Sequence, residues 1–255
     1  MVDTSLTFFH AIGYLRIPEL FTAAQVRMLR AAAHRLFGGS GGLVDLPDWR
    51  RRIDDAVSAD PVFAAVATSE QMVRALRPVL GPDIELVENR HNHVRAYPVA
   101  TVDRLHRDVL QWSRSVLTVL VYLTDCTDTA SATRVVPGSH LWPSTGAPNN
   151  GDTWLDQAQH HAELVDQAVT VPARAGDVVL MHGQLYHAGA GSSVTGPRIV
   201  FTLAYRSVDE LAQPGPETHT QSYALTAAQE GPPHVRLIAG RRAYRGRGAV
   251  HHEQG

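Results

Sequence analysis

Residues 176–206 read GDVVLMHGQLYHAGAGSSVTGPRIVFTLAYR. Two short runs in this stretch, Asp177–His182 and Arg198–Arg206, are rich in Val, Leu, Ile, Phe and Tyr. Between them the chain is small and polar, with several Gly residues and a Pro. Apolar runs of this length, bounded by turn-forming residues, indicate β-strands. The stretch therefore predicts two strands of a β core with an irregular connection between them.

The same kind of run recurs through the preceding hundred or so residues. It occurs at Glu85–Tyr97, Val116–Thr124, Thr133–Val136 and Ala168–Val171. Several short strands in one chain are typical of a β-sandwich or barrel, and the repeated strand-and-helix alternation of a doubly wound fold is missing. We therefore predict a mainly β core over about 84–206.

The first eighty residues have helical periodicity instead. Apolar residues recur at spacings of three and four in Thr22–Phe37, where Thr22 is a suitable N-cap, and again in Ser58–Leu80. The second run ends at Gly81-Pro82, a strong stop signal. These patterns predict helices that flank the β core.

The chain is expected to form a single domain, 1–255. A helical cover takes about 1–82, the β core about 84–206, and a C-terminal extension 207–255. Residues 144–165 are polar and read as a long insertion between strands, which is either a lid or an ordinary excursion.

Composition excludes several classes of enzyme. All 23 Lys and Arg residues are Arg, so the chain lacks the lysine that P-loop NTPases, pyridoxal enzymes and protein kinases require. With 44% hydrophobic and 19% charged residues, the chain has the make-up of a globular protein. A net charge of -2 gives no basic field, so neither nucleic acid nor a membrane is expected as a partner.

The sequence also bears on the compartment. A single cysteine, Cys126, cannot form an internal disulfide, which favours a reducing environment. The longest apolar run, Val116–Leu123, is too short to span a bilayer, and the N-terminus lacks a cationic start followed by an apolar block. We expect a cytoplasmic protein, and the sequence leaves its oligomeric state open.

Three side chains in the β region form a candidate metal site. In an extended backbone, the i, i+2 spacing of His106 and Asp108 sends both side chains to one face, with Arg107 turned away. A further histidine, His187, comes much later and belongs to a different strand. Two neutral imidazoles and one carboxylate form the facial triad of non-haem Fe(II) oxygenases, which leaves open positions for a co-substrate and O2.

A fourth residue has the chemistry to anchor a co-substrate. Arg198 lies eleven residues beyond His187, where a hairpin would return its guanidinium toward the metal. Because the guanidinium fork donates two parallel hydrogen bonds, it suits a planar carboxylate. The sequence therefore predicts that Arg198 binds the far carboxylate of a dicarboxylic keto acid.

The strand before the metal motif supplies candidates for a substrate pocket. Its residues His91, His93, Arg95 and Tyr97 alternate onto one face. One or two of them are expected to line the pocket, and Arg95 is the preferred candidate.

Five stretches of the chain resemble one known family, the phytanoyl-CoA dioxygenase family of Fe(II)- and 2-oxoglutarate-dependent oxygenases. The resemblance extends over most of the chain, and the stretches that carry it are FFHAIGYLRIPELFTAAQVRMLR (8–30), HRDVLQW (106–112), RVVPGSH (134–140), GDVVLMHGQLYHAG (176–189) and PRIVFTLAYR (197–206). The resemblance implies a double-stranded β-helix, a cupin-like jelly roll, with the metal at the mouth of the barrel.

The resemblance also implies roles for individual residues. His106, Asp108 and His187 would bind Fe(II), and Arg198 would anchor 2-oxoglutarate. Many relatives carry Ser two residues after the distal histidine, where this chain has Gly189, and this difference removes one possible contact to the co-substrate.

Two further positions match the family less specifically. Thr118 matches a small hydroxyl residue that can hydrogen-bond 2-oxoglutarate, or it is a strand threonine with no role in the site. Trp112 matches an aromatic residue that lies beside iron and substrate in related hydroxylases, or it is an ordinary packing residue.

The implied activity is oxidation of a C–H bond of a small molecule, coupled to conversion of 2-oxoglutarate and O2 into succinate and CO2. Relatives that halogenate lack the carboxylate ligand, so Asp108 favours oxygenation. Many similar enzymes tailor antibiotics, and by analogy we expect a secondary-metabolite substrate. Two alternatives stay open: a cupin-like metalloenzyme that does not use 2-oxoglutarate, and a non-catalytic jelly-roll binding module with a structural metal.

Overall fold

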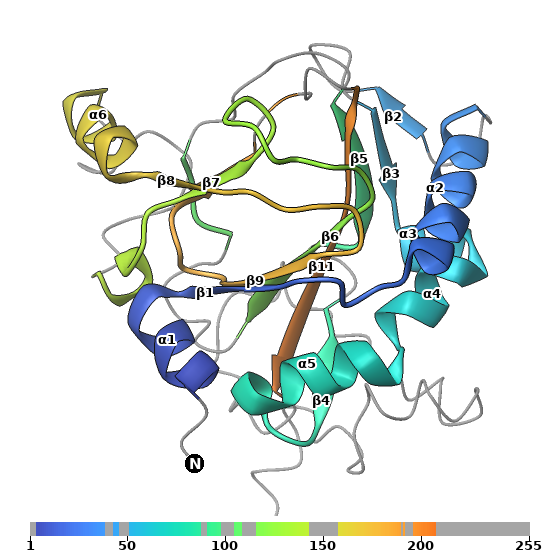
Figure 1. The fold of residues 1–255 in the computed structure, drawn as a ribbon, viewed down its shortest axis with the longest axis horizontal. Helices are drawn as coiled ribbons and strands as arrows, with labels where there is room; N and C mark the ends of the chain where they lie inside the picture. Colours follow the sequence, from blue (N-terminus) through green and yellow to red (C-terminus); the bar gives the residue numbers. More distant parts are fainter. Residues whose placement is uncertain are drawn as a thin grey trace, which may run out of the picture.

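The computed structural model describes residues 4–38, 43–45, 51–87, 91–97, 105–108, 116–142, 158–189, 191 and 196–207. In this part of the chain, two antiparallel β-sheets face each other, and helices cover the outer side of the larger sheet (Figure 1). The mainly β architecture predicted from the sequence is confirmed.

The larger sheet has eight strands within the described residues. Its order is β1 (Tyr14–Ile17), β9 (Val178–His182), β6 (Leu117–Tyr122), β11 (Arg198–Ser207), β5 (His93–Tyr97), β3 (Arg51–Asp54) and β2 (Leu43–Asp45), and β4 (Ile84–Leu86) also pairs with β11. The smaller sheet has the order β10 (His187–Ala188), β7 (Thr133–Val135) and β8 (Val169–Val171).

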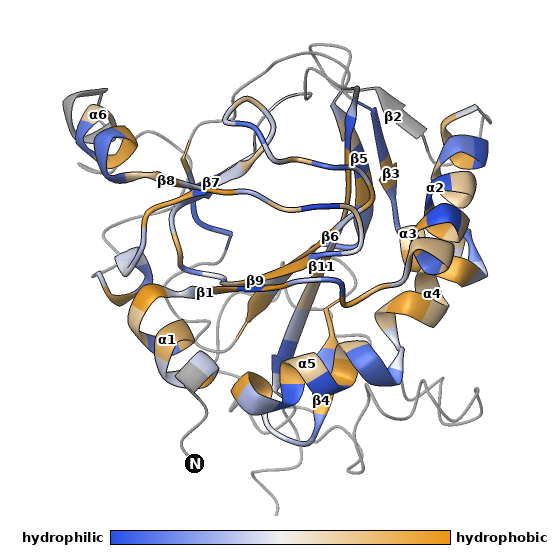
Figure 2. Ribbon diagram, in the orientation of Figure 1, coloured by the Kyte–Doolittle hydropathy of each residue, from blue (hydrophilic) through white to orange (hydrophobic). Residues whose placement is uncertain are grey.

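The helices are mostly N-terminal. They are α1 (Thr4–Ile12), α2 (Ala23–Gly38), α3 (Ala56–Ala59), α4 (Pro61–Ala67), α5 (Glu70–Leu80), the 3-10 turn η2 (Ser139–Leu141) and α6 (Ala158–Gln167). Figure 2 shows that α2 and α5 each carry both hydrophobic and hydrophilic residues, whereas α4 and the central strands β6 and β9 are largely hydrophobic. This pattern suits helices that bury one side on a sheet whose two faces are both covered.

Alternation along β11 separates the helical core from the space between the sheets. Phe201 and Leu203 point into the core that the large sheet forms with α2, α4 and α5. Val200 points the other way, into the cluster between the two sheets. Because successive strand residues face opposite sides, Arg198 and Thr202 share the inter-sheet face with Val200. Alternate residues of β11 therefore contribute to the helical core and to the space between the two sheets.

The predicted helix start at Thr22 is confirmed by its hydrogen bonds. The Thr22 hydroxyl accepts from the backbone N–H of Gln25 at 3.3 Å, and the Gln25 side-chain oxygen accepts from the Thr22 N–H at 2.9 Å. This reciprocal arrangement is a capping box, which satisfies donors that the first helical turn leaves without partners.

The predicted helical run Ser58–Leu80 is wrong as a single unit, because three helices occupy it. Asp60 caps α4 by accepting from the N–H of Val62 at 3.0 Å, and the first residue of α4 is a proline. Ser69 caps α5 by accepting from the N–H of Met72 at 3.3 Å. The apolar spacing continues across these caps, so periodicity alone does not reveal the breaks.

The expected helical cover is also not purely helical. Residues 14–17, 43–45 and 51–54 are strands β1, β2 and β3 of the large sheet. Strands of three or four residues are too short to show a period of two, and they are defined by their partners in the sheet. The predicted run Glu85–Tyr97 likewise divides into β4 and β5.

Parts of the predicted insertion and extension lie outside the described residues. Within 144–165 the structure describes the chain only from Ala158, where α6 begins, and 208–255 falls outside it. Among the described helices, none combines the length and apolarity needed to cross a membrane.

We predict that Gly176→Ala is strongly destabilising. Gly176 has φ of 97°, and a Cβ there would lie 2.4 Å from the carbonyl oxygen of Phe21, a backbone atom that has no freedom to move aside. The expected loss is about 2–5 kcal/mol of unfolding free energy, measured by denaturant titration. Gly81→Ala is the control, since Gly81 also has a positive φ, 82°, but open space around it, so it should lose only the backbone strain of about 1–3 kcal/mol and less than Gly176→Ala loses. Equal losses would contradict the packing argument.

Candidate functional site

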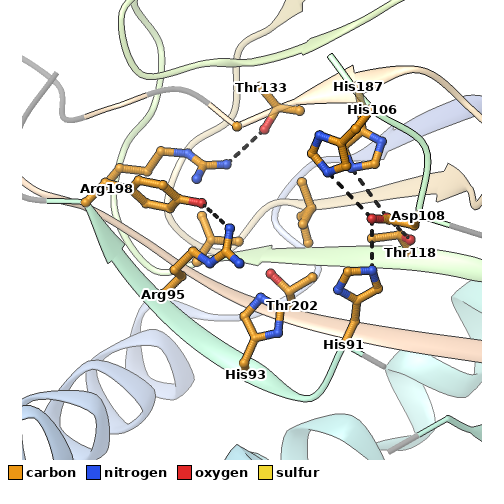
Figure 3. A pocket seen from close by; sticks show the side chains of 14 residues that line it. His91, His93, Arg95, His106, Asp108, Thr118, Thr133, His187, Arg198 and Thr202 are labelled. Atoms are coloured by element: carbon orange, nitrogen blue, oxygen red, sulfur yellow. Dashed lines mark hydrogen bonds and ion pairs between the residues drawn. The ribbon is translucent and has the colours of Figure 1, made fainter. Parts of the chain in front are cut away.

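A cavity lies between the two sheets, lined by residues of β5, β6 and β11 from the larger sheet and of β7 and β10 from the smaller one (Figure 3). The cavity has a volume of about 80 Å³. It is lined by His91, His93, Arg95, Tyr97, His106, Asp108, Thr118, Leu120, Thr133, His187, Gly189, Arg198, Val200 and Thr202.

Backbone pairing brings the predicted metal ligands together. His106 and His187 form an antiparallel bridge, with N–H to carbonyl distances of 2.8 and 2.9 Å in the two directions. The N–H of Asp108 donates to the carbonyl of Gly183 at 3.0 Å. The two segments are therefore fixed against each other at the positions where the ligands leave the backbone.

The three side chains converge as the sequence predicts. Ligand atoms of His106, Asp108 and His187 all lie within 4.8 Å of one another. Nε2 of His187 is 3.4 Å from Asp108 Oδ2, and Nε2 of His106 is 3.7 Å from Asp108 Oδ1. Two imidazoles and one carboxylate at these separations can share one divalent metal ion on a single face.

The ring of His187 is oriented by a backbone group. Its Nδ1 lies 3.0 Å from the carbonyl oxygen of Leu185. A carbonyl only accepts, so Nδ1 carries the proton and Nε2 keeps its lone pair for the metal. Outer contacts of this type fix both the tautomer and the orientation of metal-binding histidines.

Both buried ligands have the protonation state that metal binding needs. Burial lowers the pKa of His187 to about 4, so its imidazole is neutral near pH 7. Burial alone would raise the pKa of Asp108, but the nearby His91 outweighs it and holds that pKa well below its ordinary value. A neutral imidazole and an ionised carboxylate are the ligand forms of these groups.

Two other side chains contact the carboxylate oxygens of Asp108. Nε2 of His91 lies 2.9 Å from Asp108 Oδ1, and the hydroxyl of Thr118 donates to Asp108 Oδ2 at 2.5 Å. In this structure the contact of Thr118 is thus with a metal ligand, and its contact with 2-oxoglutarate stays a prediction. His91 was predicted to lie on the strand that contains His93 and Arg95, but it precedes β5; it lines the cavity, and its contact with Asp108 was not predicted.

Arg198 is buried in the cavity wall, with only 3% of its surface exposed. Its Nη2 donates to the hydroxyl of Thr133 at 3.0 Å, and its guanidinium carbon lies 5.0 and 5.8 Å from the ring centres of Tyr97 and Tyr122. Its Nε is buried without a hydrogen-bond partner. Among the described residues no carboxylate pairs with it, so its charge calls for an anionic ligand.

The structure describes three of the four other residues that the sequence analysis singled out. Arg95 lines the cavity, and its Nη1 donates to the Tyr97 hydroxyl at 2.9 Å. Gly189 also lines the cavity, while Trp112 lies outside the described residues. Arg107 is turned away from the ligands, as predicted, and donates to the carbonyl of Ser139 at 2.9 Å.

Thr133 is a cavity residue that the sequence did not identify. Its hydroxyl joins Arg198 to the hydroxyl of Tyr122, 2.6 Å away. It belongs to β7 of the smaller sheet, so its position beside Arg198 arises only when the two sheets pack together. No local pattern in the sequence marks this residue.

We predict that Thr118→Val weakens metal binding by about 10- to 100-fold, because the hydroxyl that orients Asp108 is lost while the side-chain shape is kept. Titration with Ni(II) would measure the affinity. Thr118→Ser, which keeps the hydroxyl, should recover most of it. An unchanged affinity in the valine variant would show that this hydrogen bond does not position the ligand.

Curated relatives of this chain include dioxygenases. The chain is 30% identical over 176 residues to the multifunctional dioxygenase prhA of Penicillium brasilianum, a match that covers 62% of this chain and 55% of that protein. The chain thus spans about half the length of this relative.

Solved structures show the same fold. The epimerase SnoN in complex with Fe3+, alpha ketoglutarate and nogalamycin RO has a TM-score of 0.70 at 20% identity, covering 86% of this chain and 93% of SnoN. HygX from Streptomyces hygroscopicus with nickel, 2-oxoglutarate and hygromycin B bound has a TM-score of 0.65 at 23% identity, covering 87% and 93%. The predicted jelly-roll fold is confirmed.

A family match covers the region that builds the two sheets and the site. Residues 9–200 match the family described as phytanoyl-CoA dioxygenase, which is three quarters of the chain and includes all three predicted metal ligands. The family predicted from the sequence is confirmed, and the chain belongs to the phytanoyl-CoA dioxygenase family.

Proposed function

We propose that this protein is an Fe(II)- and 2-oxoglutarate-dependent oxygenase that oxidises a C–H bond of a small molecule. One observation carries the proposal. A three-ligand metal site and a buried arginine without a carboxylate partner among the described residues line the same cavity. A metal ion would bind the three ligands, and a dicarboxylate would neutralise the charge of the arginine.

The ligand set fits Fe(II). His106, Asp108 and His187 would hold the ion on one face, through two neutral imidazoles and one carboxylate. Bound Fe(II) and 2-oxoglutarate supply the oxidative decarboxylation that couples O2 to oxidation of the substrate, with release of succinate and CO2. The protein contributes the binding, the orientation and the control of side reactions.

Arg198 would bind the distal carboxylate of 2-oxoglutarate. Its fork donates two hydrogen bonds to a planar carboxylate, and Thr133 holds its Nη2 in place. Burial strengthens this pairing, since little water competes at a side chain that is 3% exposed. Leu120 and Val200 give the cavity apolar walls beside the metal ligands.

The carboxylate ligand favours oxygenation over halogenation. Asp108 is ionised and would bind the metal at the position that a halide would otherwise need. His91 and Thr118 hold both of its oxygens, so the carboxylate is positioned as a ligand rather than directed elsewhere.

The substrate that we propose is a secondary metabolite, and the reaction would take place in the cytoplasm. Solved structures with the same fold, SnoN and HygX, contain nogalamycin RO and hygromycin B, both small molecules. The single cysteine, Cys126, is buried and unbridged, which fits a reducing compartment.

We predict that anaerobic Fe(II) protein develops a charge-transfer absorption when 2-oxoglutarate is added, because the keto acid binds the metal directly. Asp108→Ala should lose the absorption together with bound iron. Arg74→Gln, on the exposed surface of α5, is the control and should behave as wild type. A wild-type protein that binds iron but gives no absorption would rule out 2-oxoglutarate as the co-substrate.

We predict that Arg198→Gln raises the dissociation constant for 2-oxoglutarate by roughly 30-fold or more. Loss of one partner from a buried ion pair costs about 2–5 kcal/mol, and each 1.4 kcal/mol is a factor of ten. Arg198→Lys should recover part of the affinity, since it restores the charge without the fork. Calorimetry measures the constants. Unchanged affinity in the glutamine variant would favour the cupin-like alternative that does not use 2-oxoglutarate.

A further inference from the structure

The two segments that carry the metal ligands also carry side chains that face away from the cavity. The three ligands line the cavity, and the four residues beside them in the chain do not. These four are Leu105, Arg107, Tyr186 and Ala188. All four are buried, with at most 6% of their surface exposed. Because successive residues of an extended backbone face opposite sides, these side chains form the back of the metal site.

At the back of the site, Arg107 and Tyr186 stack on each other. The guanidinium carbon of Arg107 is 4.4 Å from the centre of the Tyr186 ring, a distance typical of a cation–π contact. Arg107 lies between His106 and Asp108 in the chain. Tyr186 directly precedes His187. The stack therefore joins the two ligand-bearing segments through side chains that are not themselves ligands.

Ser139 of η2 binds both segments at once. Its carbonyl oxygen accepts from Nη2 of Arg107 at 2.9 Å, and its hydroxyl accepts from the backbone N–H of Tyr186 at 2.8 Å. Ser139 is 0% exposed. Removal of its hydroxyl would leave a buried N–H without that partner, which is costly. One residue thus connects the segment of Arg107 to the segment of Tyr186 through two hydrogen bonds.

The turn that contains Ser139 is itself anchored to a helix. The N–H of Gly138 donates to the carbonyl of Ile12 at 2.9 Å. Nε2 of His140 lies 3.0 Å from the carbonyl oxygen of His10 and donates to it, since a carbonyl only accepts. Both carbonyls belong to α1. The turn therefore gives the back of the metal site a fixed point of attachment.

An apolar cluster fills the space around these polar contacts. Leu105 and Ala188, which flank the two metal-binding histidines, belong to one buried cluster with Val136 and with Leu164 of α6. Leu164 is 2% exposed. Since α6 begins within the predicted insertion 144–165, the described part of this insertion packs against the back of the site.

We propose that Ser139 and Arg107 are positioning residues, which together with Tyr186 clamp the two ligand-bearing segments from behind and hold the three ligands at their metal-binding separation. The backbone bridge sets the spacing of the two segments, and the clamp, on the side opposite the ligands, resists their rotation about that bridge. The inference rests on the proposed function, because positioning matters only if the three ligands bind a metal ion.

The test compares two serine variants of the full-length protein. Ser139→Ala removes the hydroxyl that accepts from the N–H of Tyr186. Ser69→Ala is the matched control, because the Ser69 hydroxyl also accepts from a backbone N–H, that of Met72, but lies at the start of α5 and outside the cavity. Both variants should lower the Tm of the metal-free protein. Only Ser139→Ala should weaken Ni(II) binding, by about tenfold or more in calorimetry, and change the visible absorption spectrum of bound Co(II).

Arg107 provides a second arm of the test. Arg107→Met keeps the length of the side chain but removes the donors and the charge, so it should weaken Ni(II) binding to a similar degree and change the Co(II) spectrum. Arg107→Lys restores a charged donor without the planar fork, and it should recover part of the affinity and of the spectrum. If Ser139→Ala does not fold, the Arg107 variants decide alone.

Two results would overturn the inference. Ser139→Ala and Arg107→Met could keep the wild-type Ni(II) affinity and Co(II) spectrum, or Ser69→Ala could weaken Ni(II) binding as much as Ser139→Ala does. Failure of the proposed function gives different results. A folded wild-type protein that binds neither Ni(II) nor Co(II) would overturn the metal site and the clamp with it. A wild type that binds Ni(II) but no 2-oxoglutarate would contradict the proposed function, while the variants would still support or overturn the clamp.

Discussion

The antiparallel bridge between His106 and His187 is the interaction on which the site depends. Two backbone hydrogen bonds join a segment that precedes β6 to a strand of the smaller sheet. They bring into one place two imidazoles and a carboxylate that are far apart in the chain. Backbone pairing is well suited to this task, because strand register fixes side-chain direction as well as distance. The metal site is therefore a consequence of how the two sheets meet.

Burial then gives each polar group in the cavity its chemical state. It keeps His187 neutral, while His91 keeps Asp108 ionised, so that both are competent ligands. It also makes the charge of Arg198 costly unless an anion accompanies it. A metal ion and a dicarboxylate relieve these costs together. The cavity is thus suited to binding a metal ion and a dicarboxylate together.

The sequence predicted the features that local pattern determines. The apolar runs indicated the β core, and the spacing of His106 and Asp108 indicated a shared face, which the structure confirms. It did not predict the breaks at Asp60 and Ser69, because caps interrupt a helix without changing its apolar spacing. Strands of three or four residues were likewise hidden, since their partners rather than their own sequences define them.

Local sequence pattern did not predict contacts between segments that are far apart in the chain. The link from Thr133 to Arg198 crosses from one sheet to the other, and the contact of His91 with Asp108 joins neighbouring segments of the cavity wall.

A crystal structure of the anaerobic protein with Fe(II) and 2-oxoglutarate is the most direct test of the proposed site. We predict that the distal carboxylate lies at about 2.7–3.1 Å from two nitrogens of Arg198. A carboxylate bound elsewhere, with Arg198 still without an anion, would contradict the account.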